Sequence, residues 1–160
     1  MTDFRVGTGF DAHALEPGVP LVLGGLEIPF ERGLAGHSDG DVLAHALIDA
    51  VLGAAGLGDI GSIFPSDDDR FRSASSLDLL ADAYLRAREV GFELVNADCI
   101  LIGEEPRIAE HRDQMRGRLA TVMGADPERV NVRATTTDGL GFTGRGEGLA
   151  AHAVVLLRHL

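Results

Sequence analysis

The spacing of apolar residues constrains the fold of this chain more than any other feature of its sequence. Alternating or continuous apolar runs predict β-strands at residues 5–10, 21–23, 26–28, 92–102, 130–137 and 149–157. Apolar residues spaced three and four apart predict helices at residues 38–56, 76–91 and 106–123. This order predicts an α+β fold, in which a single domain spanning residues 1–160 is a sandwich of a mixed β-sheet with helices packed on one face.

Composition narrows the class of protein. The 160-residue chain is long enough for a sizeable core, and its net charge of −11 argues against a nucleic-acid partner. All 14 basic residues are arginines, so Schiff-base chemistry and a phosphate-binding P-loop are excluded. We expect neither a membrane span nor a signal peptide. Cys99 is the lone cysteine and cannot form an internal disulfide, which predicts a cytoplasmic location.

Two histidine–carboxylate clusters predict a metal site. Asp11 and His13 lie two residues apart at the end of a predicted strand, so their side chains share one face. His45 lies on the first predicted helix. Together these three residues, here called the metal cluster, can offer three ligands and an open position, as a catalytic zinc requires. From spacing alone, a surface Asp–His pair and a structural histidine explain the same residues equally well.

His37 and Ser38 come at the predicted start of the first helix, where free backbone N–H groups favour a phosphate. Simple N-capping by Ser38 explains the serine equally well. Residues 36–40 also fit the GxSxG pattern of serine hydrolases, with His152 as a conceivable triad member. We disfavour that interpretation, because the preceding residues do not form a buried strand and the chain is short for that fold.

Two loops carry further polar groups. Residues 57–75 are rich in Gly, Asp and Ser, and a loop of this length in a compact domain is often a lid or binding loop. Thr135, Thr136 and Thr137 leave a predicted strand for a glycine-rich turn, where hydroxyls and backbone donors can hold phosphate oxygens. Asp138 follows them and can hold a divalent cation. A solvated turn explains either loop equally well.

Several longer motifs, taken in order, resemble one enzyme family over residues 5–157. They are GFDAH, GHSDGDVLAH, GDIGSIFP and VNVRATTTDGLGFTGRGEG. These motifs are similar to those of the 2-C-methyl-D-erythritol 2,4-cyclodiphosphate synthase family. The resemblance implies a phosphorus–oxygen lyase of non-mevalonate isoprenoid biosynthesis. Such an enzyme converts 4-diphosphocytidyl-2-C-methyl-D-erythritol 2-phosphate to the cyclic diphosphate and CMP, and the 2-phosphate of the substrate is itself the nucleophile.

The resemblance also implies roles for particular residues. The metal cluster would bind Zn²⁺ or a similar divalent ion, and Asp138 is the family position nearest a second ion, Mg²⁺ or Mn²⁺, held with the substrate diphosphate. His37 and Thr136 match positions that stabilise the transition state. Residues 103–109 match the cytidine pocket. The full set of positions that match substrate contacts is Asp11, His13, His37, Ser38, Asp59, Ile60, Gly61, Phe64, Pro65, Ser66, Asp67, Asp68, Gly103, Glu104, Glu105, Pro106, Arg107, Ile108, Ala109, Thr135, Thr136, Thr137, Asp138, Phe142 and Arg145.

The implied assembly is a homotrimer with active sites between subunits and a central channel. Phe142, Arg145 and Glu147 match residues that line this channel, which holds an isoprenoid diphosphate in some members. A trimeric isoprenoid-diphosphate binding protein with little catalysis is therefore the alternative function. The chain departs from the family pattern at Ser66, where other members carry an acid, and at residues 138–139, where Asp-Gly replaces a common Glu-Lys pair.

Overall fold

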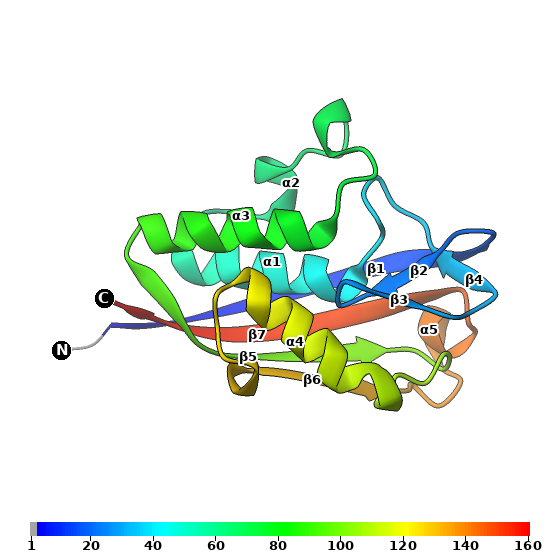
Figure 1. Cartoon of the computed structure of the whole chain (residues 1–160). Coiled ribbons are helices and arrows are strands. Elements are labelled where there is room, and N and C mark those ends of the chain that lie inside the picture. Colours follow the sequence, from blue (N-terminus) through cyan, green and yellow to red (C-terminus); the bar gives the residue numbers. More distant parts are fainter. Residues whose placement is uncertain (1–2) are drawn as a thin grey trace.

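The computed structural model describes residues 3–160 (Figure 1). Its strands are β1 (Phe4–Pro17), β2 (Leu21–Leu23), β3 (Leu26–Ile28), β4 (Arg32–Leu34), β5 (Phe92–Ile102), β6 (Val130–Thr135) and β7 (Gly148–His159). Its α-helices are α1 (Val42–Ala55), α2 (Ile60–Ile63), α3 (Ser76–Glu89), α4 (Arg112–Val122) and α5 (Gly141–Gly144). Short 3₁₀ turns are η1 (Asp69–Phe71), η2 (Ala109–His111) and η3 (Pro127–Arg129). Within residues 3–160, no helix has the length and apolar character needed to cross a membrane.

The predicted α+β fold with a mixed sheet is confirmed. The main sheet has the strand order β4-β1-β7-β5-β6, in which β5 and β6 are parallel and the other pairs are antiparallel. The predicted strands 21–23 and 26–28 form a hairpin, because Gly24 and Gly25 both adopt the positive φ that a tight turn between β2 and β3 requires. Helix α1 packs on β1 and β7, α4 packs on β6, and α3 lies against α1, so the helices cover one face of the sheet (Figure 1).

Two glycines let α1 approach β1 unusually closely. A Cβ at Gly7 would lie 1.9 Å from the backbone oxygen of Ala50, and one at Gly9 would lie 1.9 Å from that of Ala46. Only a residue without a side chain fits at either position. The sequence Gly-Thr-Gly in β1 and the alanines of α1 therefore fix the distance between strand and helix, and with it the height of His45 above the sheet.

The other face of the sheet carries exposed apolar residues. Gly7 and Gly9 face α1, so the alternation of a β-strand turns the even-numbered residues of β1 away from the helices. Phe4, Val6 and Phe10 are more than half exposed there. We call this the open face of the sheet.

Several predicted boundaries were wrong. Helix α1 begins at Val42 rather than near Ser38, because Asp41 is its N-cap and accepts a hydrogen bond from the N–H of Ala44 at 3.1 Å. Helix α3 begins at Ser76, as predicted, with Ser75 in its N-cap position, and ends at Glu89 rather than at residue 91. The helix predicted from Pro106 starts only with η2 and α4, because the preceding segment bends around the ends of β5 and β6.

Other segments contain more structure than was predicted. Strand β1 continues beyond residue 10 and includes Asp11 and His13. Strand β4 was not predicted, because Arg32, Gly33 and Leu34 show no alternation of apolar residues, and it pairs with the end of β1. The predicted loop 57–75 contains α2 and η1, and it projects beyond α1 and α3 at the top of Figure 1.

Candidate functional site

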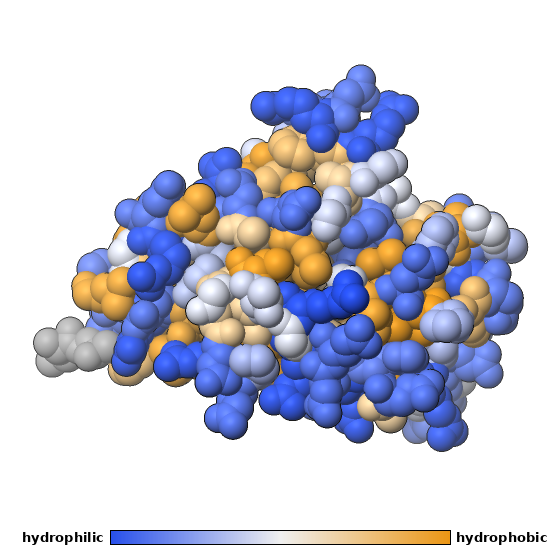
Figure 2. All heavy atoms as spheres, viewed as in Figure 1, coloured by the Kyte–Doolittle hydropathy of each residue, from blue (hydrophilic) through white to orange (hydrophobic). Residues whose placement is uncertain are grey.

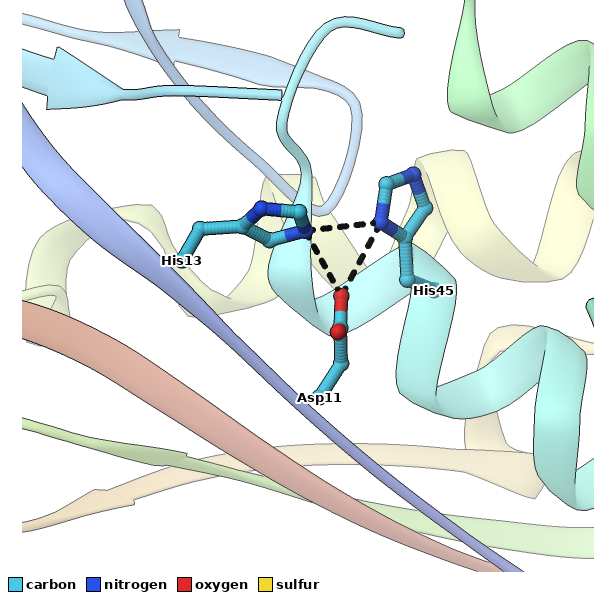
Figure 3. Close-up of side chains that lie close together, drawn as sticks. All are labelled: Asp11, His13 and His45. Carbon is cyan, nitrogen blue, oxygen red and sulfur yellow. Dashed lines mark hydrogen bonds and ion pairs between the residues drawn. The ribbon is translucent and has the colours of Figure 1, made fainter. Parts of the chain in front are cut away.

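The metal cluster comes together as predicted (Figure 3). Oδ2 of Asp11 lies 2.8 Å from Nε2 of His13 and 3.0 Å from Nδ1 of His45. The two histidine nitrogens are 3.1 Å apart. The three side chains thus point at one another from β1 and α1, although His45 is 34 residues from Asp11 and 32 from His13 in the sequence.

Local structure explains this convergence. Asp11 and His13 lie two apart in β1, so both point to the helix-covered face of the sheet. His45 stands one turn into α1 and is only 8% exposed. The buried N-cap Asp41 fixes the start of that helix, because its carboxylate also accepts the N–H groups of Gly24 and Gly25 at 2.9 and 2.7 Å. The hairpin β2–β3 therefore anchors the end of α1 that carries His45.

Charge and burial shift the protonation of the cluster. Burial of Asp11 favours its neutral form, but hydrogen bonds from His13 and His45 outweigh burial and hold its pKa well below the usual range. The hydrogen bond to Asp11 raises the pKa of His13 above its ordinary value, although burial opposes this shift. Burial also raises the pKa of Asp41 to about 6, against three backbone N–H groups that favour its charged form. The cluster therefore retains its carboxylate charge and attracts positive charge.

A metal ion fits this donor set. Two imidazole nitrogens and a carboxylate oxygen all lie within 4.8 Å of one another and face a common point. Such nitrogen and oxygen ligands bind zinc and similar divalent ions. The alternative of an isolated surface Asp–His pair and a separate structural histidine does not describe this arrangement. Asp11, His13 and His45 can hold a metal ion.

The metal cluster opens into a cavity of about 550 Å³, here called the metal cavity. The predicted site residues that line it are Asp11, His13, His37, Ser38, His45, Ile60, Gly61, Phe64, Pro65, Ser66 and Asp67. Phe71 and Leu79 add apolar walls that the sequence did not suggest. The metal cavity thus combines a charged floor with a partly apolar rim.

His37 and Ser38 line the metal cavity from the loop before α1, not from the helix N-terminus as predicted. Nε2 of His37 donates a hydrogen bond to the backbone carbonyl of Asp68 at 2.9 Å, which ties this loop to the projecting segment. Oγ of Ser38 lies 2.9 Å from Nε2 of His45. Both side chains therefore stand beside the metal cluster. His152, the conceivable triad member, lies on β7 opposite Phe10 of the open face.

The projecting segment around α2 and η1 has a polar tip. Figure 2 shows hydrophilic side chains at its top and apolar ones beneath. Phe64 and Phe71 pack edge to face below, with ring centroids 5.3 Å apart. Asp59 caps α2 by accepting the N–H of Ser62 at 2.9 Å, and Asp68 pairs with an arginine at 2.6 Å. The carboxylates of Asp59 and Asp68 are thus engaged within the segment, outside the cavity lining.

The predicted cytidine pocket and threonine cluster meet at a second cavity. This cavity of about 380 Å³, here called the strand-end cavity, is lined by Gly103, Glu104, Pro106, Arg107, Ile108, Ala109, Arg112, Ala134, Thr135 and Thr136. The carboxylate of Glu104 accepts the N–H groups of Thr137 and Gly139 at 3.3 and 3.2 Å, which joins the two loops. Oδ1 of Asp138 accepts the Thr136 hydroxyl at 3.1 Å.

The remaining predicted positions lie next to the strand-end cavity. Glu105 and Arg145 line a neighbouring cavity of about 230 Å³. Arg145 forms an ion pair with Glu147 at 3.0 Å, and Phe142 is exposed. These residues therefore gather around the turn that includes α5.

Within this chain, the metal cavity and the strand-end cavity share no lining residue. Ala12 of β1 and Thr135 of β6 lie in one row across the sheet, through Ala150 and Ile102. Three strand spacings separate them, or ~14 Å. Side chains in such a row point to the same face, so Thr135 faces away from the metal cluster, as Ala12 does. His37 and Thr136, predicted for one reaction, are thus apart in the single chain.

Sequence reasoning missed residues that support the site from behind. Ser76 is 0% exposed, and its Oγ lies 2.8 Å from Nε2 of His45. Asp39 accepts the N–H of Ser76 at 2.9 Å. Arg112 lines the strand-end cavity. No spacing rule indicated these contacts, because they join segments that are distant in sequence.

Comparisons with known proteins agree on one family. Residues 4–158 match the YgbB family. The chain is 56% identical over 155 residues to the 2-C-methyl-D-erythritol 2,4-cyclodiphosphate synthase of Geobacillus kaustophilus, covering 97% of this chain and 98% of that relative. The bifunctional IspDF from Campylobacter jejuni superposes with a TM-score of 0.96 at 45% identity, covering 100% of this chain and 43% of that longer chain. The CDP-bound form of a 2C-methyl-D-erythritol-2,4-cyclodiphosphate synthase superposes with a TM-score of 0.87 at 40% identity, covering 96% of this chain and 99% of that one.

Proposed function

The chain belongs to the YgbB family, and we propose that it forms 2-C-methyl-D-erythritol 2,4-cyclodiphosphate from 4-diphosphocytidyl-2-C-methyl-D-erythritol 2-phosphate. CMP is the second product, and the pathway is non-mevalonate isoprenoid biosynthesis. The observation that carries the proposal is the convergence of Asp11, His13 and His45 beside His37 and Ser38 in one cavity. A binding protein with little catalysis is not favoured, because the relatives compared are named as synthases.

The reaction needs no nucleophile from the protein. An oxygen of the substrate 2-phosphate forms a bond to the β-phosphorus, and the bond from that phosphorus to the CMP oxygen breaks, so CMP leaves with the electron pair. This is the chemistry of a phosphorus–oxygen lyase. When bound, Zn²⁺ or a similar ion at the metal cluster, with Mg²⁺ or Mn²⁺ near Asp138, would polarise the phosphates and offset their charge.

The residues of the chain position the substrate and stabilise charge. We propose that the His37 imidazole, held by the carbonyl of Asp68, and the hydroxyl of Thr136 stabilise the transition state. Ser38 would contact the phosphate, and Ile60, Gly61 and residues 64–67, which line the metal cavity, would contact the methylerythritol part. With the reacting groups held in line, most of the rate enhancement would come from positioning.

The strand-end cavity is the proposed cytidine pocket. Residues 103–109 would contact the base, and Thr135, Thr137 and Asp138 would contact the phosphates. A related synthase has a CDP-bound structure whose match covers 96% of this chain, which supports a nucleotide partner for the protein. Arg112 adds a cation to a cavity that would receive an anionic ligand.

We propose that three chains assemble so that each active site lies between two subunits. Three strand spacings, ~14 Å, separate Ala12 of β1 from Thr135 of β6 in one chain, and the two cavities share no lining residue, so a metal cavity would meet the strand-end cavity of a neighbour. The open face, with Phe4, Val6 and Phe10 exposed, offers an apolar surface for such assembly. Phe142, Arg145 and Glu147 would line a central channel suited to an isoprenoid diphosphate. The cytoplasmic location stays a prediction from the sequence.

The decisive experiment combines product formation with metal content. We expect the purified protein to release CMP and the cyclic diphosphate from the named substrate, measured by chromatography and phosphorus NMR. His45→Ala should lose bound zinc and nearly all CMP release. His159→Ala is the matched control, because this histidine lies at the far end of β7. This variant should keep both its bound zinc and its CMP release. Normal turnover by His45→Ala would refute the metal site, and no product from wild type would refute the proposed reaction.

A further inference from the structure

A buried hydrogen-bond chain lies behind the metal cluster. Oγ of Ser76 is 2.8 Å from Nε2 of His45, the ring nitrogen that faces away from Asp11. The Ser76 hydroxyl also donates a hydrogen bond to the carboxylate of Asp39. That carboxylate accepts two backbone N–H groups as well, from Ser76 at 2.9 Å and Asp41 at 3.0 Å. Ser76 is fully buried, does not line the metal cavity, and therefore touches neither substrate nor metal.

The chemistry of these groups fixes the direction of the chain. An ionised carboxylate only accepts hydrogen bonds, so the Ser76 proton must point to Asp39. The Ser76 oxygen can then only accept from His45, which requires a proton on Nε2. A neutral imidazole carries one ring proton. Nδ1 of His45 then keeps its lone pair for a metal ion held beside Asp11, 3.0 Å away, and His13, 3.1 Å away. Without a metal ion, the Asp11 carboxylate instead favours a proton on Nδ1, so Asp11 and the Ser76–Asp39 pair favour opposite tautomers.

We propose that Ser76 and Asp39 set the tautomer of His45, so that its Nδ1 lone pair is held toward a divalent metal ion in the cluster. The proposal rests on the metal site of the proposed function. Partners of this kind orient a metal-binding histidine, and their loss typically weakens metal affinity 10–100-fold. Ser76 is thus a positioning residue that acts through His45.

Ser38 contacts the same nitrogen of His45 but cannot favour one tautomer over the other. Its Oγ lies 2.9 Å from Nε2 of His45 and 3.3 Å from Oγ of Ser76. No carboxylate contact of Ser38 is found among residues 3–160, so its hydroxyl is free to rotate and can donate or accept. Ser38 therefore tolerates either tautomer of His45, whereas Ser76 tolerates one. This difference makes Ser38 the matched control.

The first test compares Ser76→Ala with Ser38→Ala. Long-range nitrogen–proton NMR spectra of histidine-labelled, metal-free samples that carry Asp11→Ala report the tautomer with no carboxylate beside Nδ1, and a His45→Asn sample assigns the His45 signals. In that background we expect the Nε2-protonated form when Ser76 is present, with or without Ser38→Ala, and a mixture of tautomers in Ser76→Ala. In chains that keep Asp11, zinc affinity, measured by competition with a chromophoric chelator, should fall about 10–100-fold in Ser76→Ala and less than about threefold in Ser38→Ala.

Asp39→Asn provides a second test that keeps every hydroxyl. The carboxamide NH₂ can donate to Ser76, which frees the serine proton to donate to Nε2 of His45 and favours the opposite tautomer. We expect the Nδ1-protonated form to appear in the Asp11→Ala background and zinc affinity to fall in chains that keep Asp11, while circular dichroism shows a folded protein. If Ser76→Ala does not fold, this variant decides the matter alone.

Each outcome bears on a distinct claim. Wild-type tautomer and zinc affinity in folded Ser76→Ala, or in Asp39→Asn when Ser76→Ala does not fold, would overturn the proposal. A larger zinc loss in Ser38→Ala than in Ser76→Ala would overturn it as well. A wild-type protein that binds zinc but releases no CMP, with the expected tautomer in the Asp11→Ala samples, would refute the proposed function and leave the role of Ser76 standing.

Discussion

The metal cavity and the strand-end cavity differ in how much of each one chain can build. The ligands of the metal cavity are already in place within one chain. They converge within 4.8 Å, and buried Ser76 and Asp41 hold the elements behind them. The strand-end cavity is smaller, at about 380 Å³, and its threonines Thr135 and Thr136 are exposed. One region is thus organised by the core of the chain, and the other lies at its surface.

This difference means that the metal cluster depends on the fold of one chain, whereas the complete proposed site depends on assembly. The metal cluster is arranged by packing between β1 and α1, so it should form in every folded chain. The strand-end cavity lies at the β6 edge of the sheet, and in the proposed trimer it becomes part of the same site only beside another chain.

Mixing two inactive variants gives the largest expected effect. His45→Ala removes the metal side and Thr136→Ala removes a hydroxyl on the other side, and loss of one such stabilising group typically costs about 100-fold or more in kcat. In mixed trimers, roughly a quarter of the sites would combine an intact half from each variant. CMP release after co-refolding should recover to about that level. If CMP release does not recover, both halves of the site belong to one chain, and the proposed division between the two cavities is wrong.

Gly9→Ala should damage the metal side through the fold. The added Cβ would lie 1.9 Å from the backbone oxygen of Ala46, so α1 must move away from β1. Overpacking of this kind costs about 1–3 kcal/mol or more in unfolding free energy. Gly53→Ala, on the exposed side of α1, should instead stabilise by about 0.5–1 kcal/mol. Urea unfolding of both variants measures the difference, and equal stabilities would refute the close-contact explanation.

The pH dependence of zinc binding tests whether His13 is a metal ligand. Asp11 raises the pKa of His13 above 6.5, and a proton competes with the metal for this histidine. Affinity should therefore fall as the pH drops, beginning above pH 6.5 and approaching about tenfold per pH unit for one displaced proton. Chelator competition across this range measures the slope. An affinity that stays flat below pH 6.5 would contradict the assignment of His13 as a ligand.

The smallest effect concerns the strand-end cavity. If this cavity binds the nucleotide by itself, His45→Ala should change CDP affinity less than about threefold in the absence of metal, because the two cavities share no residue. Calorimetric titration with CDP tests this expectation, and Arg112→Ala serves as the variant that should weaken binding. A large loss in His45→Ala would show that the cavities are coupled.

The sequence predicted the layers of the fold and the metal ligands well. Alternation and three-four spacing are local signals, and the elements around Asp11, His13 and His45 follow them. Helix starts were less predictable, because Ser38, Asp39 and Asp41 are all acceptable N-caps and the choice depends on the distant N–H groups of Gly24 and Gly25.

The supporting residues could not be predicted from local patterns. Ser76 contacts Asp39 and His45 across 37 and 31 residues of sequence, and no periodicity records such contacts. The family resemblance did place Thr136 and residues 103–109 in one site with His37. The single chain separates them, since an assembly can unite residues that no intrachain spacing relates.

The length of strand β1 is constrained, because neighbouring residues of the strand face opposite sides of the sheet. Its odd-numbered residues, including Gly9, Asp11 and His13, face α1, and its even-numbered residues, including Phe10, face the other way. A one-residue insertion or deletion before Gly9 would exchange the two sets at once. The apolar side chains would then collide with α1, while the metal ligands would turn outward. Point substitutions can change either face of β1 without affecting the other. Insertions and deletions affect both faces, so β1 must change over evolution by substitution.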